Sequence, residues 1–323
     1  MAIEKLFLLP GRYPSIAPSL IGQGRDLEVL TGFFTEPSAS AALALLSKAA
    51  SGADIALIVP PARHYSLSLR KQAPGAIVGE VLSRAMRLIE VMVRHEEATG
   101  VNVRVVFLSS AQIYDQAEIF PTLEIDTAMM PMPLDPVGLG FLAAERLLVM
   151  SCIGPGLWPI ILRPVSVMDP LDYAQFSRSS SITLSDPFPS TSPLWVDLLS
   201  RVSTLGPTGR IPILGSGVEF RDLVHVNDLI SAITLAIDSG PRMAAYNVSS
   251  GHGASVHDFV QELSEVMFGC SVDLINRGDH PYESAKIIAP SCEAIGIDLD
   301  WRPGYDRRSI LTEMTKLARP DMV

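Results

Sequence analysis

The chain has 323 residues, which is enough for one large domain or two closely joined ones around an ample buried core. Hydrophobic residues make up 48% of the sequence and charged residues 19%, a composition that excludes intrinsic disorder. The formal net charge of −10 argues against general binding of nucleic acid, although a local basic pocket could still hold one anionic small molecule.

Four apolar runs in the first half of the chain predict buried strands. Each run is nearly continuous and is bounded by turn residues, which is typical of a strand covered on both faces of its sheet. The runs are EKLFLLP (4–10), GADIALIVPP (52–61), VNVRVVFLSS (101–110) and WPIILRPVSV (158–167).

Helical patterns lie between these runs. The alanine-rich segment 38–50 begins at a capping serine, and the amphipathic segment 75–100 ends at a glycine. The segment 135–150 begins with Asp135 and Pro136, a good cap and first-turn pair. The alternation of strands and helices predicts an α/β fold, a Rossmann-like doubly wound parallel sheet.

The sequence changes in character after about residue 168. A segment rich in Ser and Pro at 177–193 predicts a loop or a lid. Further helical patterns follow at 192–206, 224–240 and 255–269. We therefore expect a Rossmann-like domain at 1–168 and a smaller α/β substrate-binding lobe at 169–323, with some exchange of chain between them.

No pattern predicts a metal site, a disulfide framework or a membrane segment. Cys152, Cys270 and Cys292 lie far apart, and no histidine has the spacing of a metal ligand. No apolar run approaches the length of a membrane span, and the one at the N-terminus is too short for a signal peptide. A cytoplasmic protein fits these observations, since its thiols would stay reduced there.

Five segments, in this order, resemble the motifs of one large enzyme family. They are RVVFLSSAQIYD, LRPVSVMDP, GSGVEFRDLVHVNDLISAI, AYNVSSGHGASVHDFV and INRGDHPYESAKIIAPSCEAIGI. Their order and spacing resemble the extended short-chain dehydrogenase/reductase family, the nucleotide-sugar epimerases and dehydratases. The resemblance covers most of the chain after residue 50, and it implies an NAD(P) cofactor and a nucleotide-sugar substrate.

The sequence departs from this family where the cofactor would bind. The first strand is followed by LLPGRYPSIAPSLIGQG, in which only Gly11 matches the glycine-rich phosphate loop. Three prolines remove amide donors, and Tyr13 adds bulk. The resemblance also implies that about one strand–helix unit, which carries the acid for the adenosine ribose, is missing downstream, so the sheet should be truncated in its N-terminal half. It further implies that Phe33 stands where the family has an Asp that contacts the adenine side. No NAD(P) cofactor is therefore expected.

The proton-transfer pair of the family is also absent. The resemblance implies Tyr-x-x-x-Lys on the helix after the third strand, where a lysine lowers the pKa of the tyrosine. Here those positions hold Val137 and Phe141, neither of which exchanges a proton or carries a charge. Of the expected triad only a serine remains, as Ser110.

Three residues are candidates for catalysis, each with a simpler alternative. Ser110 could orient a substrate oxygen, or it could bond its own backbone at the strand end. Tyr114 could reach the cleft with its phenol, or its ring could be half buried at the sheet edge. His64 follows the second predicted strand and could act as a base, or it could be a solvated loop histidine.

Four residues are candidates for binding an anionic substrate. The resemblance implies that Arg221 binds the substrate diphosphate, although Asp222 could instead hold it in an ion pair. Arg277 is a second candidate phosphate contact. Arg63, on the sheet edge where ligands bind, and Ser166, in the LRPVSVMDP turn, complete the set.

Three further histidines have separate interpretations. His225, inside the Arg-Asp motif, is interpreted as structural, and His252 lies between glycines without a nameable partner. Asp279 and His280 are adjacent and form a candidate acid–base pair.

These observations favour a divergent family member that has lost the usual NAD(P) redox chemistry and binds a nucleotide sugar or another anionic metabolite. It would act as a non-redox enzyme, such as a lyase, isomerase or cyclase, or as a regulatory binding subunit. The alternatives are an NAD(P)-dependent epimerase or reductase with an atypical cofactor loop, and a non-catalytic scaffold. Helices 76–98 and 137–150 carry apolar residues around most of their circumference, which leaves apolar surface exposed. The resemblance implies that these two helices form a four-helix dimer interface, so a homodimer is expected.

Overall fold

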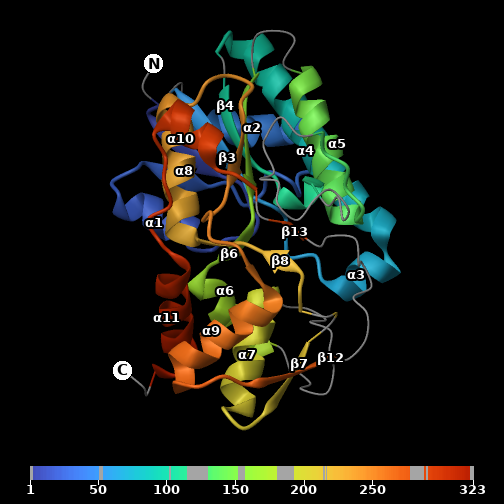
Figure 1. Ribbon diagram of the computed structural model, residues 1–323. Coiled ribbons are helices and arrows are strands. Elements are labelled where there is room, and N and C mark those ends of the chain that lie inside the picture. The colour runs from blue at the N-terminus through green and yellow to red at the C-terminus, as the bar shows by residue number, and fades with distance from the viewer. Residues whose placement is uncertain are drawn as a thin grey trace.

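A larger part built around a parallel sheet and a smaller part below it make up the molecule (Figure 1). The computed structural model describes residues 3–50, 54–101, 103–114, 130–151, 157–179, 193–213, 215, 217–276, 287–288 and 290–320.

The central sheet has six strands in the order β10-β5-β4-β3-β1-β2, and every neighbouring pair is parallel. The strands are β1 (Lys5–Leu8), β2 (Leu27–Val29), β3 (Ile55–Val59), β4 (Val103–Leu108), β5 (Leu157–Pro164) and β10 (Ala245–Val248). All five residues of β3 are buried, as expected for a strand covered on both faces. The sheet confirms the predicted α/β fold.

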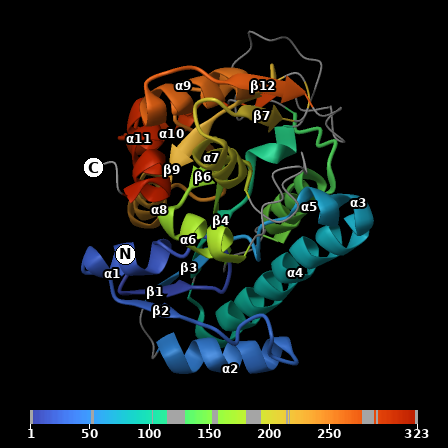
Figure 2. The same ribbon diagram turned by 90° about the horizontal axis from the view of Figure 1, so that it is seen from below.

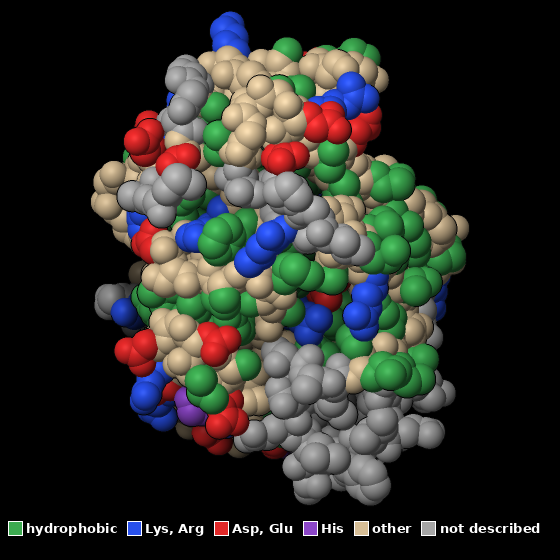
Figure 3. All heavy atoms as spheres, turned by 90° about the horizontal axis from the view of Figure 1, so that it is seen from above, with side chains coloured by type: hydrophobic (Ala, Val, Ile, Leu, Met, Phe, Trp, Pro, Cys, Tyr) green, Lys and Arg blue, Asp and Glu red, His purple; other side chains and the backbone are tan. Residues whose placement is uncertain are grey.

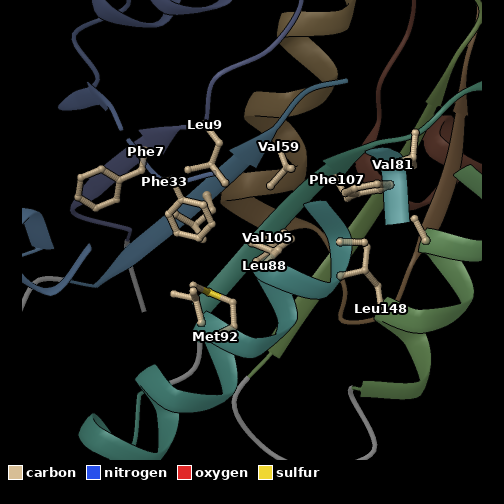
Figure 4. Close-up of a cluster of buried hydrophobic side chains, with 14 of the residues drawn as sticks. Phe7, Leu9, Phe33, Val59, Val81, Leu88, Met92, Val105, Phe107 and Leu148 are labelled. Atoms are coloured by element: carbon tan, nitrogen blue, oxygen red, sulfur yellow. The ribbon is translucent and has the colours of Figure 1, made fainter. Parts of the chain in front are cut away.

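Successive strand residues point to opposite faces of this sheet, and apolar side chains lie on both, so helices cover both faces. One face packs against α2 (Ala39–Ala50), α4 (Pro74–Thr99) and α5 (Pro136–Ser151). Figure 4 shows Leu88 of α4 beside Val105 of β4, and Val81 of α4 beside Phe107 of β4, in this core. The other face packs against α1 (Ile16–Gly22), α8 (Val226–Ser239) and α10 (Glu293–Leu299).

The sheet is shorter on one side than the usual doubly wound arrangement. In the described residues one strand, β2, lies beyond β1, whereas the usual order places two there. After β2 the chain enters α2 and returns as β3, directly beside β1. Phe33 on this path is fully buried in the core rather than exposed at a ligand edge.

The smaller part has its own hydrophobic core. Its helices are α6 (Pro170–Ser179), α7 (Leu194–Leu205), α9 (Val256–Phe268) and α11 (Arg307–Ala318), and β7 (Arg210–Ile213) pairs in parallel with β12 (Asp273–Asn276). The chain returns from this part to supply α8 and β10 to the larger one.

The remaining elements are short. They are η1 (Ala111–Tyr114), α3 (Leu67–Gln72), β6 (Ser166–Met168), β8 (Phe220–Arg221), β9 (Leu223–His225), β11 (Ala254–Ser255) and β13 (Ile287–Ile288). The strand expected at 158–167 is therefore divided, because β5 ends at Pro164 and β6 then pairs with β9 outside the main sheet. Of the loop expected at 177–193, the first three residues belong to α6, and 180–192 lie outside the described residues.

None of the helices in the described ranges is both long enough and apolar enough to cross a bilayer.

Candidate active site

A buried polar network lies beneath the carboxyl ends of the strands. Arg163 of β5 donates to Glu145 of α5 through Nε (3.1 Å) and Nη2 (2.8 Å), and both side chains are less than one tenth exposed. Ser109 donates its hydroxyl to the same carboxylate, and Arg163 donates to the phenol oxygen of Tyr114. Burial raises the pKa of Tyr114, more than the neighbouring Arg163 lowers it. The network therefore holds the Tyr114 phenol against Arg163 in the buried core.

Ser110 lies at the exit of β4 and is half buried. Its hydroxyl oxygen accepts a hydrogen bond from the backbone amide of Gln112 (3.2 Å), the local turn that its simpler interpretation predicted.

The two positions of the missing proton-transfer pair are apolar and buried. Val137 and Phe141 on α5 are each 3% exposed, and the Phe141 ring meets Phe107 edge to face. The Asp135 carboxylate caps the helix by accepting from the amides of Val137 (2.7 Å) and Gly138 (2.8 Å). The cap fixes the start of α5. Val137 and Phe141, on its first two turns, belong to the packed core.

His64 and Arg63 lie at the exit of β3 but make contacts in different directions. The His64 ring packs edge to face against Phe176 of α6, with 6.0 Å between centroids, so it lies at the junction of the two parts. Arg63 is about half exposed and donates two hydrogen bonds to Glu80 of α4, at 3.0 and 2.8 Å.

Arg221 and Asp222 lie on the edge of the smaller part. Arg221 is half buried on β8 and donates to the carbonyl of Phe220 (2.8 Å). Asp222 is buried and accepts from the hydroxyl of Ser250 and the amide of Gly251 (3.1 Å), which joins the β8–β9 turn to the loop after β10. Burial raises the pKa of Asp222, although these hydrogen bonds act in the opposite direction.

The other sequence candidates are dispersed. Ser166 is exposed on β6. His252 is exposed, and its carbonyl accepts from Arg307. Arg277, Asp279 and His280 lie outside the described residues.

His225 has a structural position. Its Nδ1 accepts from the amide of Asn227 (3.1 Å) at the start of α8, and its ring stacks on Tyr305 with 3.8 Å between centroids. Burial lowers the pKa of His225, so the neutral ring is favoured.

The loop after β1 is bound by side chains of this chain. Tyr13 is buried and has a left-handed backbone with φ of 66°. Ser15 donates to Asp169, Arg12 donates to Asp172, and both acids belong to the start of the smaller part. Sequence reasoning missed these two acids, because no local pattern connects them to a loop more than 150 residues away.

Arg84 of α4 binds the backbone just after the carboxyl ends of β1 and β3. Its Nη2 donates to the carbonyls of Pro10 (2.6 Å) and Pro60 (3.2 Å), and its guanidinium lies 3.7 Å from the Phe34 ring centroid. Burial lowers the pKa of Arg84 to about 10. This role of Arg84 was not predictable from the sequence, since the residue matches the polar face of an amphipathic helix.

The sequence that forms these sites matches the model of one protein family. The NAD dependent epimerase/dehydratase family matches residues 43–249, which is more than half of the chain. The chain belongs to this family.

Individual relatives in the family are distant. The UDP-glucose 4-epimerase of Lacticaseibacillus casei is 28% identical over 212 residues, which cover 63% of this chain and 60% of that protein. The GDP-6-deoxy-D-mannose reductase of Pseudomonas aeruginosa is 25% identical over 171 residues, 53% of this chain and 51% of the reductase. The matches thus span little more than half the length of these relatives.

Solved structures share the whole fold. UDP-glucose 4-epimerase of Thermotoga maritima with UDP-glucose gives a TM-score of 0.77 at 16% identity, covering 99% of this chain and 100% of that one. MoeE5 with UDP-glucuronic acid and NAD gives 0.74 at 18% identity, covering 98% and 99%. Together, these neighbours and the epimerase relatives agree better with the alternative of an NAD(P)-dependent enzyme than with the expectation of no cofactor.

The residues of this family member nevertheless do not fit a dinucleotide bound in the usual way. That mode requires a glycine-rich turn after β1 with free donors for the diphosphate. In this chain the Ser15 amide and the Arg12 guanidinium already bind carboxylates, and Arg84 with Phe34 covers the carbonyl end of β1. No reaction step through NAD(P) follows from this geometry.

The buried network makes a prediction about stability. Glu145→Gln removes the charge that balances Arg163 and should lower the free energy of unfolding by about 3–5 kcal/mol, the cost of an uncompensated buried charge. Urea denaturation measures the change. Glu28→Gln is the matched control, because Glu28 of the edge strand β2 pairs with Lys5 at 3.4 Å and its side chain is 48% exposed, so its substitution should cost less than about 1 kcal/mol. Equal effects of the two variants would contradict a buried ion pair.

Proposed function

We propose that this family member binds a nucleotide sugar or a related anionic metabolite without the usual NAD(P) redox chemistry. It would act as a non-redox enzyme or as a regulatory binding subunit. The observation that carries the proposal is the burial of Val137 and Phe141 in the core, at the positions of the proton-transfer pair.

The chemistry of hydride transfer explains why this observation matters. A hydroxyl that is oxidised must give its proton to a base held within hydrogen-bond reach. Val137 has no group that accepts a proton, and Tyr114 is bonded to Arg163 with a raised pKa. Ser110 remains at the strand end as a candidate for orienting a substrate oxygen. His64 remains a candidate base at the junction of the two parts.

Arg221 is the proposed anion contact. Its guanidinium keeps its charge and can bind two phosphate oxygens at once. Asp222 beside it is engaged by Ser250 and Gly251, so this carboxylate has a structural role of its own. The names of the relatives, which act on UDP- and GDP-linked sugars, support a nucleotide diphosphate as the ligand class.

The second candidate is an NAD(P)-dependent epimerase or reductase with an atypical cofactor loop. Neighbours solved with NAD and the epimerase relatives favour it. In this case the Asp169 and Asp172 contacts would have to open to admit the cofactor.

We also propose a homodimer built on α4 and α5. The two helices lie side by side (Figure 1), and in Figure 3 hydrophobic side chains gather on the same side of the molecule. Met86 and Val93 of α4 are 54% and 41% exposed, and Leu139 and Met150 of α5 are 50% and 65% exposed. Such a pair of apolar stripes would pack against its own copy across a two-fold axis.

The first prediction here concerns the cofactor. Calorimetric titration of the purified chain with NADH and with NADPH should give no binding heat, because the diphosphate donors are engaged by acids. The double substitution Val137→Tyr and Phe141→Lys should also fail to create dehydrogenase activity, since the cofactor loop is unchanged. Micromolar binding by the wild type would instead establish the second candidate.

The second prediction concerns Arg221. A melting screen with UDP, GDP and their sugars should reveal a stabilising nucleotide, and Arg221→Ala should weaken its binding by about 1.5–3 kcal/mol. The control is Arg25→Ala, which removes an arginine paired with Asp238 elsewhere on the surface and should leave the affinity unchanged. If no nucleotide shifts the wild-type melting temperature, Arg221 is not a phosphate contact.

The third prediction concerns assembly. Light scattering should give the mass of a dimer, and Met86→Glu should give a monomer, because a charge on the stripe would be desolvated in the interface. The control is Ile297→Glu on α10, since Ile297 is also apolar and 74% exposed but lies on the other face of the sheet. A monomeric wild type would refute the dimer.

A further inference from the structure

Two buried acids of the smaller part hold the loop after β1. Asp169 is fully buried between β6 and α6, and Asp172, on the first turn of α6, is 1% exposed. Figure 2 shows α6 beside β1 and α1 at the junction of the two parts.

The contacts use both oxygens of Asp169. The Ser15 amide donates to Oδ2 (3.2 Å), and the Ser15 hydroxyl donates to Oδ1 (2.5 Å). Oδ1 also accepts from the amide of Leu171 (3.0 Å). Arg12 donates through Nη2 to Oδ2 of Asp172 (2.9 Å), and its side chain is 16% exposed. The two carboxylates thus meet an amide, a hydroxyl and a guanidinium of one short loop.

These donors are the kind that binds phosphate. In a doubly wound sheet the turn after the first strand, at the carboxyl edge, is the place where a dinucleotide diphosphate is held by amides and positive charge. A diphosphate brings two adjacent negative groups, and here two carboxylates supply them from within the chain. The charge of Arg12 would be costly to bury alone, so the acids are needed for this loop to pack.

The backbone conformation of the loop after β1 is consistent with contacts to Asp169 and Asp172 that persist in the folded chain. Tyr13 keeps a left-handed backbone although its side chain is large and buried, and the Arg12 guanidinium lies 5.0 Å from its ring centroid. The Arg12 amide donates to the carbonyl of Pro61 (2.7 Å), which ties the loop to the exit of β3. A strained residue of this kind persists when its surroundings fix it.

We propose that Asp169 and Asp172 are a built-in replacement for the cofactor diphosphate, and that they fasten the β1 loop to the smaller part. This inference rests on the proposed function, since a chain that binds NAD(P) in this loop would need the acids elsewhere. The loop then joins the two parts of the molecule rather than serving a cofactor.

Anion rescue tests the proposal. The double variant Asp169→Ala with Asp172→Ala leaves Arg12 and the Ser15 donors without their anions and should melt at a lower temperature than the wild type. Added pyrophosphate, at constant ionic strength, should restore part of this loss. At about ten times its dissociation constant the expected rise is roughly 2 °C. The wild type should show no rise, because its own carboxylates fill the place.

Two controls keep the result interpretable. Asp135→Ala removes a carboxylate of similar burial that also pairs with an arginine, Arg70, and pyrophosphate should not rescue it. If the double variant does not fold, Asp172→Ala alone, which frees Arg12, should show the same rescue.

The outcomes separate this inference from the proposed function. Absence of pyrophosphate rescue in a folded variant, or equal rescue of Asp135→Ala, overturns the replacement of the diphosphate while leaving the proposed function standing. Binding of NADH by the wild type overturns both.

Discussion

The buried ion pair between Arg163 and Glu145 fixes α5 against the sheet, and the site is arranged around it. The pair joins β5 to α5, and through Ser109 and Tyr114 it also sets the exit of β4. An unbalanced charge at this depth would be costly, so all four side chains keep one arrangement. The pair therefore holds α5 in place, and Val137 and Phe141 of this helix are buried in the core.

The same contrast holds at the loop after β1. Its backbone still lies at the carboxyl edge of the sheet, and its donors still bind negative groups, but those groups are Asp169 and Asp172. Beside this loop, Arg84 donates to the carbonyls of Pro10 and Pro60, and the Phe34 ring packs on its guanidinium. In both places packing and charge balance fix the backbone, and the side chains and loop donors contact other side chains of this chain.

The sequence predicted the parallel sheet because a buried strand leaves a local signal. The apolar runs that became β1, β3 and β4, and the periodicity of α4, are each contained in one short segment. The shorter sheet edge was also predictable, since the distance between two segments revealed it. The roles of Asp169, Asp172 and Arg84 could not be predicted, because each depends on a partner far along the chain. Tyr114 was predicted either to reach the cleft with its phenol or to lie half buried at the sheet edge. Its contact with Arg163 was not predictable, because that partner lies far along the chain.

We propose that this family member binds no dinucleotide cofactor but keeps a binding site for an anionic substrate. Native mass spectrometry of freshly purified chain tests it most directly, because tightly held cofactors survive purification. The account predicts that no mass corresponding to NAD or NADP is retained, and that any retained molecule is an anionic metabolite such as a nucleotide sugar. One molecule of NAD or NADP per chain would contradict the account.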